Sequence, residues 1–214
     1  MSANLPRLAV GLTVAAGAMF ANVHSFGDDH AARAQAAARP QQVSAAQKPA
    51  QVNAASLLKV AESQVGVAEN AAGGGTPFHR WYMSSQRAAE TVNRDGGSIR
   101  AYANAPWCAM FVSWVGEKSG LRPTVGWDAY TVTFAKWFKA NKRWGTKSTP
   151  GAVVFFSWKG GKDLDDIQHV GFVEKDNGDG TISTIEGNTG NGKVEQRVRP
   201  KSQVVGYGYP DYKA

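Results

Sequence analysis

Five residues near the C-terminus, Asp-Asn-Gly-Asp-Gly at 176–180, constrain the fold of this chain more than any other segment. An Asn-Gly or Asp-Gly pair between two segments of strand composition is the strongest short-range signal for a β-hairpin. The flanking segments have that composition, so we expect them to form two adjacent antiparallel strands. Strands are accordingly expected at 152–157, 168–175, 181–186, 194–199 and 203–209.

The residues ahead of these strands have helical periodicity instead. Ser56 is a good N-cap, Pro106 suits the first position of a helix, and Asp128 is a further cap. Glycines at 66 and 120 are natural helix ends. Helices are accordingly expected at 56–66, 79–90, 106–120 and 128–138. Helices followed by an antiparallel meander predict an α+β fold in which the N-terminal helices pack on the sheet.

The first 55 residues predict an exported protein. After Arg7, residues 8–20 are uncharged and mainly apolar, which suits a signal peptide but is shorter than the about 20 residues of a membrane span. Residues 26–55 are rich in Ala, Gln, Pro and Arg and carry few large apolar side chains that could offset the entropy of ordering. We expect a signal peptide at 1–25, a disordered linker at 26–55 and a single catalytic domain at 56–214. The alternative for the predicted signal peptide is a buried helix of the mature domain, and the alternative for the linker is a marginal Ala-rich helix.

The predicted location is therefore outside the cell or in the cell wall, with no stable membrane insertion after signal cleavage. The net charge of +7 favours anionic partners such as wall polymers. No sequence motif supports binding to nucleic acid. Much of the charge lies at Lys136, Lys139, Lys142, Arg143 and Lys147, and a solvated helix face is an equally good interpretation of that group.

Cys108 is the only cysteine, so it is either a buried inert thiol or one kept for its reactivity. With Pro106 at the first helical position, Cys108 would occupy the third. The first four N–H groups of a helix have no partner within it, and the positive helix end favours a thiolate. One helical turn would then supply both a nucleophile and a donor for an oxyanion.

His169 is the candidate base, since it alone of the four histidines lies within an apolar strand. The hairpin decides its partner. A turn centred on 177–178 places His169 opposite Glu186, whereas a turn centred on 178–179 places it opposite Asn188. Either side chain would hold the imidazole in one orientation, as the third member of a catalytic triad does.

Four blocks of sequence carry a family resemblance: PWCAMFVSW at 106–114, GAVVFF at 151–156, HVGFVE at 169–174 and IEGNT at 185–189. Together they resemble the CHAP family, the cysteine- and histidine-dependent amidohydrolases and peptidases. The resemblance extends over roughly residues 57–210. It implies a papain-like fold, cleavage of an amide or peptide bond in peptidoglycan, and four site residues, namely Cys108, His169, Glu186 and Asn188.

The chain departs from that family at three points. Trp107 stands where some members have Gln, which leaves a second oxyanion donor unassigned, and Ala152 stands where Asp is common. The acidic calcium loop of some members is absent, so we expect no metal and no cofactor. Three other carboxylates are interpreted as a solvated acidic loop, namely Asp163, Asp165 and Asp166.

Aromatic side chains that would line a substrate groove are Trp81, Tyr82, Trp107 and Trp158, although core packing is the alternative for them. Two other functions stay open at this point. The chain would be an amidase or acyltransferase of papain-like fold that acts on another amide, or a wall-binding module without catalytic activity.

Overall fold

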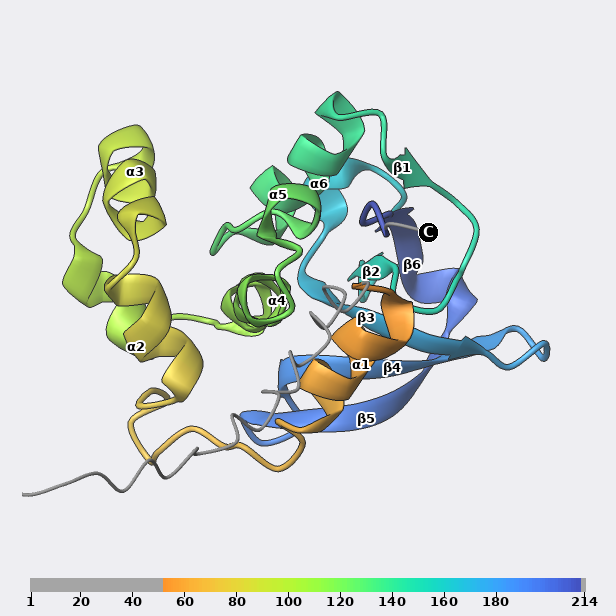
Figure 1. The fold of residues 1–214 in the computed structure, drawn as a ribbon, viewed down its shortest axis with the longest axis horizontal. Coiled ribbons are helices and arrows are strands. Elements are labelled where there is room, and N and C mark those ends of the chain that lie inside the picture. Colours follow the sequence, from red (N-terminus) through yellow and green to blue (C-terminus); the bar gives the residue numbers. More distant parts are fainter. Residues whose placement is uncertain (1–51, 213–214) are drawn as a thin grey trace, which may run out of the picture. The chain divides into compact units, whose positions relative to one another are not determined.

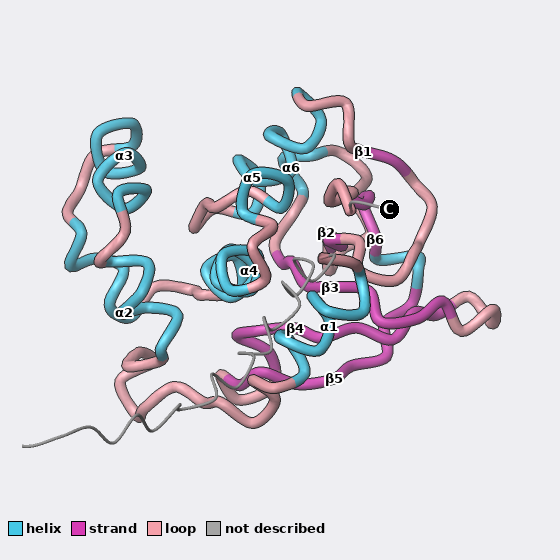
Figure 2. Tube along the Cα trace, viewed as in Figure 1, coloured by secondary structure: helices cyan, strands magenta, loops and turns pink. Residues whose placement is uncertain are grey.

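The computed structural model describes residues 52–212, which form an α+β fold with most helices ahead of one antiparallel sheet (Figures 1 and 2). This confirms the predicted fold class. The signal peptide predicted at 1–25, and all of the predicted linker except residues 52–55, lie outside the described residues. The α-helices are α1 (Ala54–Glu62), α2 (Pro77–Met83), α3 (Gln86–Asp95), α4 (Cys108–Lys118), α5 (Arg122–Val125) and α6 (Thr131–Ala140).

The sheet has the strand order β1-β6-β2-β3-β4-β5. Its strands are β1 (Trp144–Gly145), β2 (Val153–Phe156), β3 (His169–Asp176), β4 (Thr181–Thr189), β5 (Lys193–Pro200) and β6 (Val204–Gly208). Strands β2 to β5 form the predicted meander, but β6 returns to the other side of β2. The physical reason lies in β2, because all four of its apolar residues are buried and such a run is typical of a strand in the middle of a sheet.

Helix α4 positions the site, and it lies between α2 and strands β3 and β4 (Figure 1). It carries apolar residues almost all round, as expected of a helix in the centre of a core. A Cβ atom on Gly187 of β4 would lie 2.6 Å from Cβ of Phe111 in α4. Only glycine therefore allows the helix to approach this closely to the strand that carries the neighbouring Glu186.

The helix boundaries differ from the prediction where capping chemistry decides them. Helix α1 begins at Ala54 because Asn53, rather than Ser56, is its N-cap, and Ser56 completes the capping box from inside the helix. The helix predicted at 79–90 is divided into α2 and α3, since Ser85 caps a new helix. The short helix α5 and a 3₁₀ helix at Ile99–Asn104 have no counterpart in the prediction. Within residues 52–212 no helix has the length and apolar character needed to cross a membrane.

Candidate active site

Cys108 is the first residue of α4. The prediction that Pro106 opens this helix is wrong, because Trp107 is the N-cap and has a non-helical backbone. The Trp107 side chain is held in the core, where its indole donates a hydrogen bond to Glu69 at 3.0 Å and stacks on Phe78. The consequence drawn from the sequence is unchanged, since the N–H of Cys108 still belongs to the first turn and the positive helix end still lies at the thiol.

His169 is the first residue of β3 and is nearly fully buried. Its Nε2 donates a hydrogen bond of 2.9 Å to Oε2 of Glu186, which leaves Nδ1 for the hydrogen bond to Cys108. Burial by itself would lower the pKa of His169, but the bonds to Cys108 and Glu186 outweigh it and raise the pKa from 6.5 to about 9. The two hydrogen bonds therefore favour the protonated imidazole.

Glu186 is fully buried, and every donor around it favours the carboxylate. Thr184 donates to Oε1 at 2.6 Å, and Arg199 donates to both oxygens, at 2.9 Å to Oε1 and 2.6 Å to Oε2. Burial opposes ionisation, but these bonds and the one from His169 lower the pKa of Glu186 from 4.5 to about 2. A charged acceptor thus fixes the orientation of the His169 ring.

Near His169 the register is the one predicted for a turn centred on 178–179, so the position opposite His169 is that of Asn188 rather than Glu186. Strand β3 pairs Phe172 with Ile185, and the same register continued places Gly171, rather than His169, opposite Glu186. A Cβ atom on Gly171 would lie 2.7 Å from Cγ of Glu186, so the carboxylate side chain occupies the space over this glycine. His169 and Glu186 are therefore diagonal neighbours, a separation that long side chains can bridge.

Asn188, the alternative partner of His169, lies in an irregular part of β4 between Glu186 and Thr189. Its backbone is left-handed, with φ of +55°, a conformation that Asn tolerates better than most residues. Of the two orienting residues that the sequence left open, Glu186 is the one that binds the imidazole.

A cleft of about 610 Å³ opens at Cys108. Its walls come from the segment before α4, the turn after α3 and the start of α6. Those walls include Gly97, Tyr102, Pro106, Tyr130 and Gln168, and none of the described residues that line the cleft is charged. Cys108 therefore borders a largely neutral groove.

The site and its surroundings also match a known family. The family model described as CHAP domain covers residues 100–188, a segment that contains Cys108, His169 and Glu186. The segment matches the CHAP domain. This confirms the resemblance inferred from the four sequence blocks, and the α+β fold is consistent with the papain-like arrangement of that family. No curated protein matches the chain.

The CHAP match indicates an amidohydrolase or peptidase that uses a cysteine and a histidine, in a family of peptidoglycan hydrolase-like enzymes. Thr189 and Arg199, which contact each other and the Glu186 network, lie beyond the matched segment. Neither residue was predicted from the sequence. Arg199 lies on the same face of β5 as Glu195 and Arg197. Only the pairing of β5 with β4, which places Glu195 opposite Glu186, shows that Glu186 lies on that face of the sheet.

The four aromatic residues predicted to line the groove lie in different surroundings. Trp158 is 41% exposed, and its ring centroid is 5.2 Å from that of His169, so it flanks the site. Trp81 lines a separate hollow together with Trp127. Tyr82 and Trp107 have no exposed surface and belong to the core rather than to a groove, which corrects the prediction for both.

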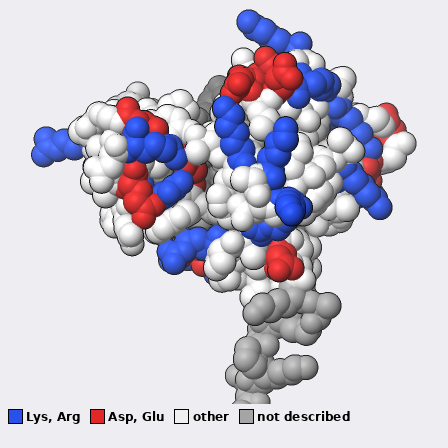
Figure 3. All heavy atoms as spheres, turned by 90° about the horizontal axis from the view of Figure 1, so that it is seen from above, with Lys and Arg blue, Asp and Glu red and all other residues white. Residues whose placement is uncertain are grey.

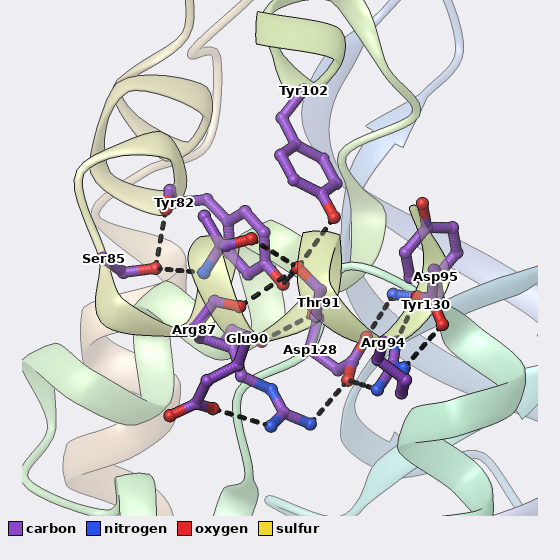
Figure 4. Close-up of polar contacts among 12 residues, drawn as sticks. Tyr82, Ser85, Arg87, Glu90, Thr91, Arg94, Asp95, Tyr102, Asp128 and Tyr130 are labelled. Carbon is purple, nitrogen blue, oxygen red and sulfur yellow. Dashed lines mark hydrogen bonds and ion pairs between the residues drawn. The ribbon is translucent and has the colours of Figure 1, made fainter. Parts of the chain in front are cut away.

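Asp128, a buried carboxylate, lies within a network of polar contacts (Figure 4). Its Oδ2 accepts hydrogen bonds from Arg87 at 2.8 Å and Arg94 at 3.0 Å, and its Oδ1 accepts one of 2.9 Å from the N–H of Tyr130. Both arginines come from α3, whereas Tyr130 caps α6 and lines the cleft. The network thus ties the two elements whose ends form the walls near Cys108.

The acidic loop holds its carboxylates in local interactions. Asp163 and Asp166 form a capping box around the 3₁₀ helix Leu164–Asp166, and Asp165 pairs with Lys136 at 2.7 Å. Among residues 52–212, no group of three or more His, Cys, Asp or Glu side chains is placed to hold a metal ion.

Proposed function

We propose that this chain is a secreted hydrolase that cleaves an amide or peptide bond of bacterial peptidoglycan by a thiol mechanism. One observation carries the proposal. A cysteine at the start of a helix is hydrogen-bonded to a buried histidine whose other ring nitrogen binds a buried carboxylate, at 2.9 Å between Nε2 of His169 and Oε2 of Glu186. This is the arrangement that activates a thiol nucleophile.

In the proposed reaction, Cys108 as thiolate attacks the carbonyl carbon of the scissile amide while His169 carries the proton. The backbone N–H of Cys108 donates to the oxyanion that develops on the carbonyl oxygen. His169 then protonates the leaving amine, and the C–N bond breaks to leave a thioester. Water, deprotonated by His169, hydrolyses the thioester and restores the thiol. Glu186 holds the ring in the orientation that both proton transfers require.

The choice of substrate rests on the CHAP match, on the cleft and on charge. The uncharged walls of the cleft suit a peptide with small neutral side chains. Lys and Arg side chains are spread across the face seen in Figure 3, and the whole chain carries a net charge of +7. A positive surface attracts anionic wall polymers and thereby raises the concentration of the enzyme at its substrate. Export would follow from the predicted signal peptide.

The test is the clearing of purified cell walls by the native protein and by Cys108→Ala at equal folded concentration. We expect the native protein to clear the suspension and to release amino groups without new reducing sugar ends, and we expect Cys108→Ala to bind walls without clearing them. The masses of the released fragments identify the bond.

Two results would contradict the proposal. New reducing ends would mean that a glycosidic bond is cut, which a thiol–imidazole pair does not explain. Sedimentation of both proteins with walls, and clearing by neither, would make the chain a binding module for this substrate.

A further inference from the structure

Arg199 of β5 has the geometry of a built-in partner of Glu186 rather than that of a surface charge. Its Nε and Nη2 donate in parallel to the two carboxylate oxygens, at 2.9 and 2.6 Å, and Nη2 also donates to Oγ1 of Thr189 at 3.0 Å. Only 16% of the Arg199 side chain is exposed. A bidentate pair of this kind fixes both the position and the rotation of the carboxylate.

The same guanidinium also contacts the aromatic residue that flanks the imidazole. Cζ of Arg199 lies 4.9 Å from the ring centroid of Trp158, and the Trp158 and His169 centroids are 5.2 Å apart. Arg199 therefore reaches His169 by two routes, through Glu186 on one side and through Trp158 on the other. Any movement of the guanidinium would change the surroundings of the imidazole.

Counting charges shows what Arg199 supplies. The ionisable groups that face Glu186 are His169 from β3 and Arg199 from β5, with Cys108 of α4 beyond His169. Glu195 lies opposite Glu186 in the ladder but is paired with Arg197 at 3.1 Å. With Cys108 as thiolate and His169 as imidazolium, the buried site is neutral only if the guanidinium is present. Without it, Glu186 would leave one uncompensated negative charge in a dry site, whether Cys108 and His169 are thiolate and imidazolium or thiol and imidazole, which is costly. Protonation of Glu186 would relieve that cost but would also remove the negative partner that favours the imidazolium.

We propose that Arg199 is a positioning residue of this site, which holds Glu186 against His169 and supplies the positive charge that keeps this buried carboxylate ionised beside the imidazolium. The inference rests on the Cys108–His169 pair of the proposed function. It adds a residue outside the matched family segment, which ends at residue 188.

The experiment measures the rate of alkylation of Cys108 by iodoacetamide, a neutral probe, between pH 5 and pH 10. Cys108 is the only cysteine, so the rate reports this thiol alone. The test variant is Arg199→Gln. The matched control is Arg197→Gln, which removes an arginine from the same strand. The carboxylate partner of Arg197 is Glu195, and this pair is partly exposed.

We expect alkylation of Arg199→Gln at pH 6.5 to be at least fivefold slower than that of the native protein, and the two rates to converge above pH 9, where thiolate forms in either protein. Arg197→Gln should follow the native profile within a factor of two. If Arg199 served packing alone, its loss would change the rate by the same factor at every pH. That result, or a profile that superposes on the native one, would overturn the proposal.

A second variant is used if Arg199→Gln shows no cooperative unfolding transition and is therefore not properly folded. Arg199→Lys keeps the charge but reaches the carboxylate with a single ammonium group, so we expect a rate at pH 6.5 at least twofold below the native value and convergence above pH 9. A profile identical to that of the native protein would overturn the proposal.

Alkylation requires no wall substrate, so the two proposals fail separately. Native protein that is alkylated rapidly at pH 6.5 but does not clear walls would remove the proposed function and leave the Arg199 comparison valid. The alkylation rate of the native protein could instead rise only near the pKa of an ordinary cysteine thiol, about 8.5. That result would refute the Cys108–His169 pair and, with it, the role of Arg199.

Discussion

Replacing Glu186 with Gln keeps the size of the side chain and removes its charge. The native carboxylate is fully buried and accepts hydrogen bonds from His169, Thr184 and both arms of Arg199. A carboxamide has one oxygen and two N–H donors, so one donor would face the N–H groups that now bind Glu186. Arg199 would also lose its counter-charge, although only 16% of its side chain is exposed to solvent.

The buried ion pair and the lowered pKa of Glu186 lead to a similar expected loss of stability. Removing one partner from a buried ion pair costs about 3–5 kcal/mol of unfolding free energy. Independently, the pKa of Glu186 is lowered from 4.5 to about 2, which corresponds to roughly 3 kcal/mol of stability. Because the folded-state pKa is the lower one, this stability is present above pH 4.5 and is lost as the pH falls through about 2.

The assay is urea unfolding followed by tryptophan fluorescence, with Glu195→Gln as the matched control because its ion pair is partly exposed and worth about 0–1 kcal/mol. We expect Glu186→Gln to be about 3 kcal/mol less stable than the native protein at pH 7, and the difference to shrink as the pH falls toward the folded-state pKa of about 2. A loss at pH 7 no larger than that of the control, or a difference that does not change with pH, would refute the reasoning.

Three further predictions follow from neighbouring contacts. Gly171→Ala adds a Cβ 2.7 Å from Cγ of Glu186 and 2.9 Å from a backbone oxygen, so we expect a loss of about 1–3 kcal/mol in urea unfolding and slower wall clearing; native behaviour in both assays would contradict this. In NMR titrations the His169 ring should titrate near pH 9 in the native protein and at a lower pH in Cys108→Ala, because one of the two hydrogen bonds that raise its pKa is lost; an unchanged midpoint would argue against the Cys108 contact. Asp128→Asn should lose about 1–3 kcal/mol, since two arginines in α3 lose their buried counter-charge while remaining partly exposed. Asp95→Asn, whose carboxylate is partly exposed, is the control for this last change and should lose less than about 0.5 kcal/mol.

Features that depend on a few consecutive residues could be predicted from the sequence. The Asp-Asn-Gly-Asp-Gly turn predicts the β3–β4 hairpin, and apolar periodicity predicts the helix that begins near Cys108. Helix ends were less well predicted, because capping by Asn53 and Ser85 competes with other polar residues nearby. The resemblance that led to the CHAP family likewise rests on short local blocks.

The partners of His169 depended on the tertiary structure. A hairpin turn alone allows more than one register, and in the observed one Glu186 reaches the imidazole diagonally because Gly171 leaves the space above it empty. The position of Arg199 in the same network required β5 to pair with β4. Tyr82 and Trp107 have the composition of groove residues but are enclosed by other elements.

The sequence by itself determined the fold class and placed a lone cysteine at a helix start and a histidine in a strand, because turns, caps and periodicity act within a few residues along the chain. The tertiary structure decided which side chains surround that histidine. Register, sheet twist and burial bring together residues far apart in the sequence, and the charges of Glu186 and Arg199 acquire their effect only when both lie in the same dry space.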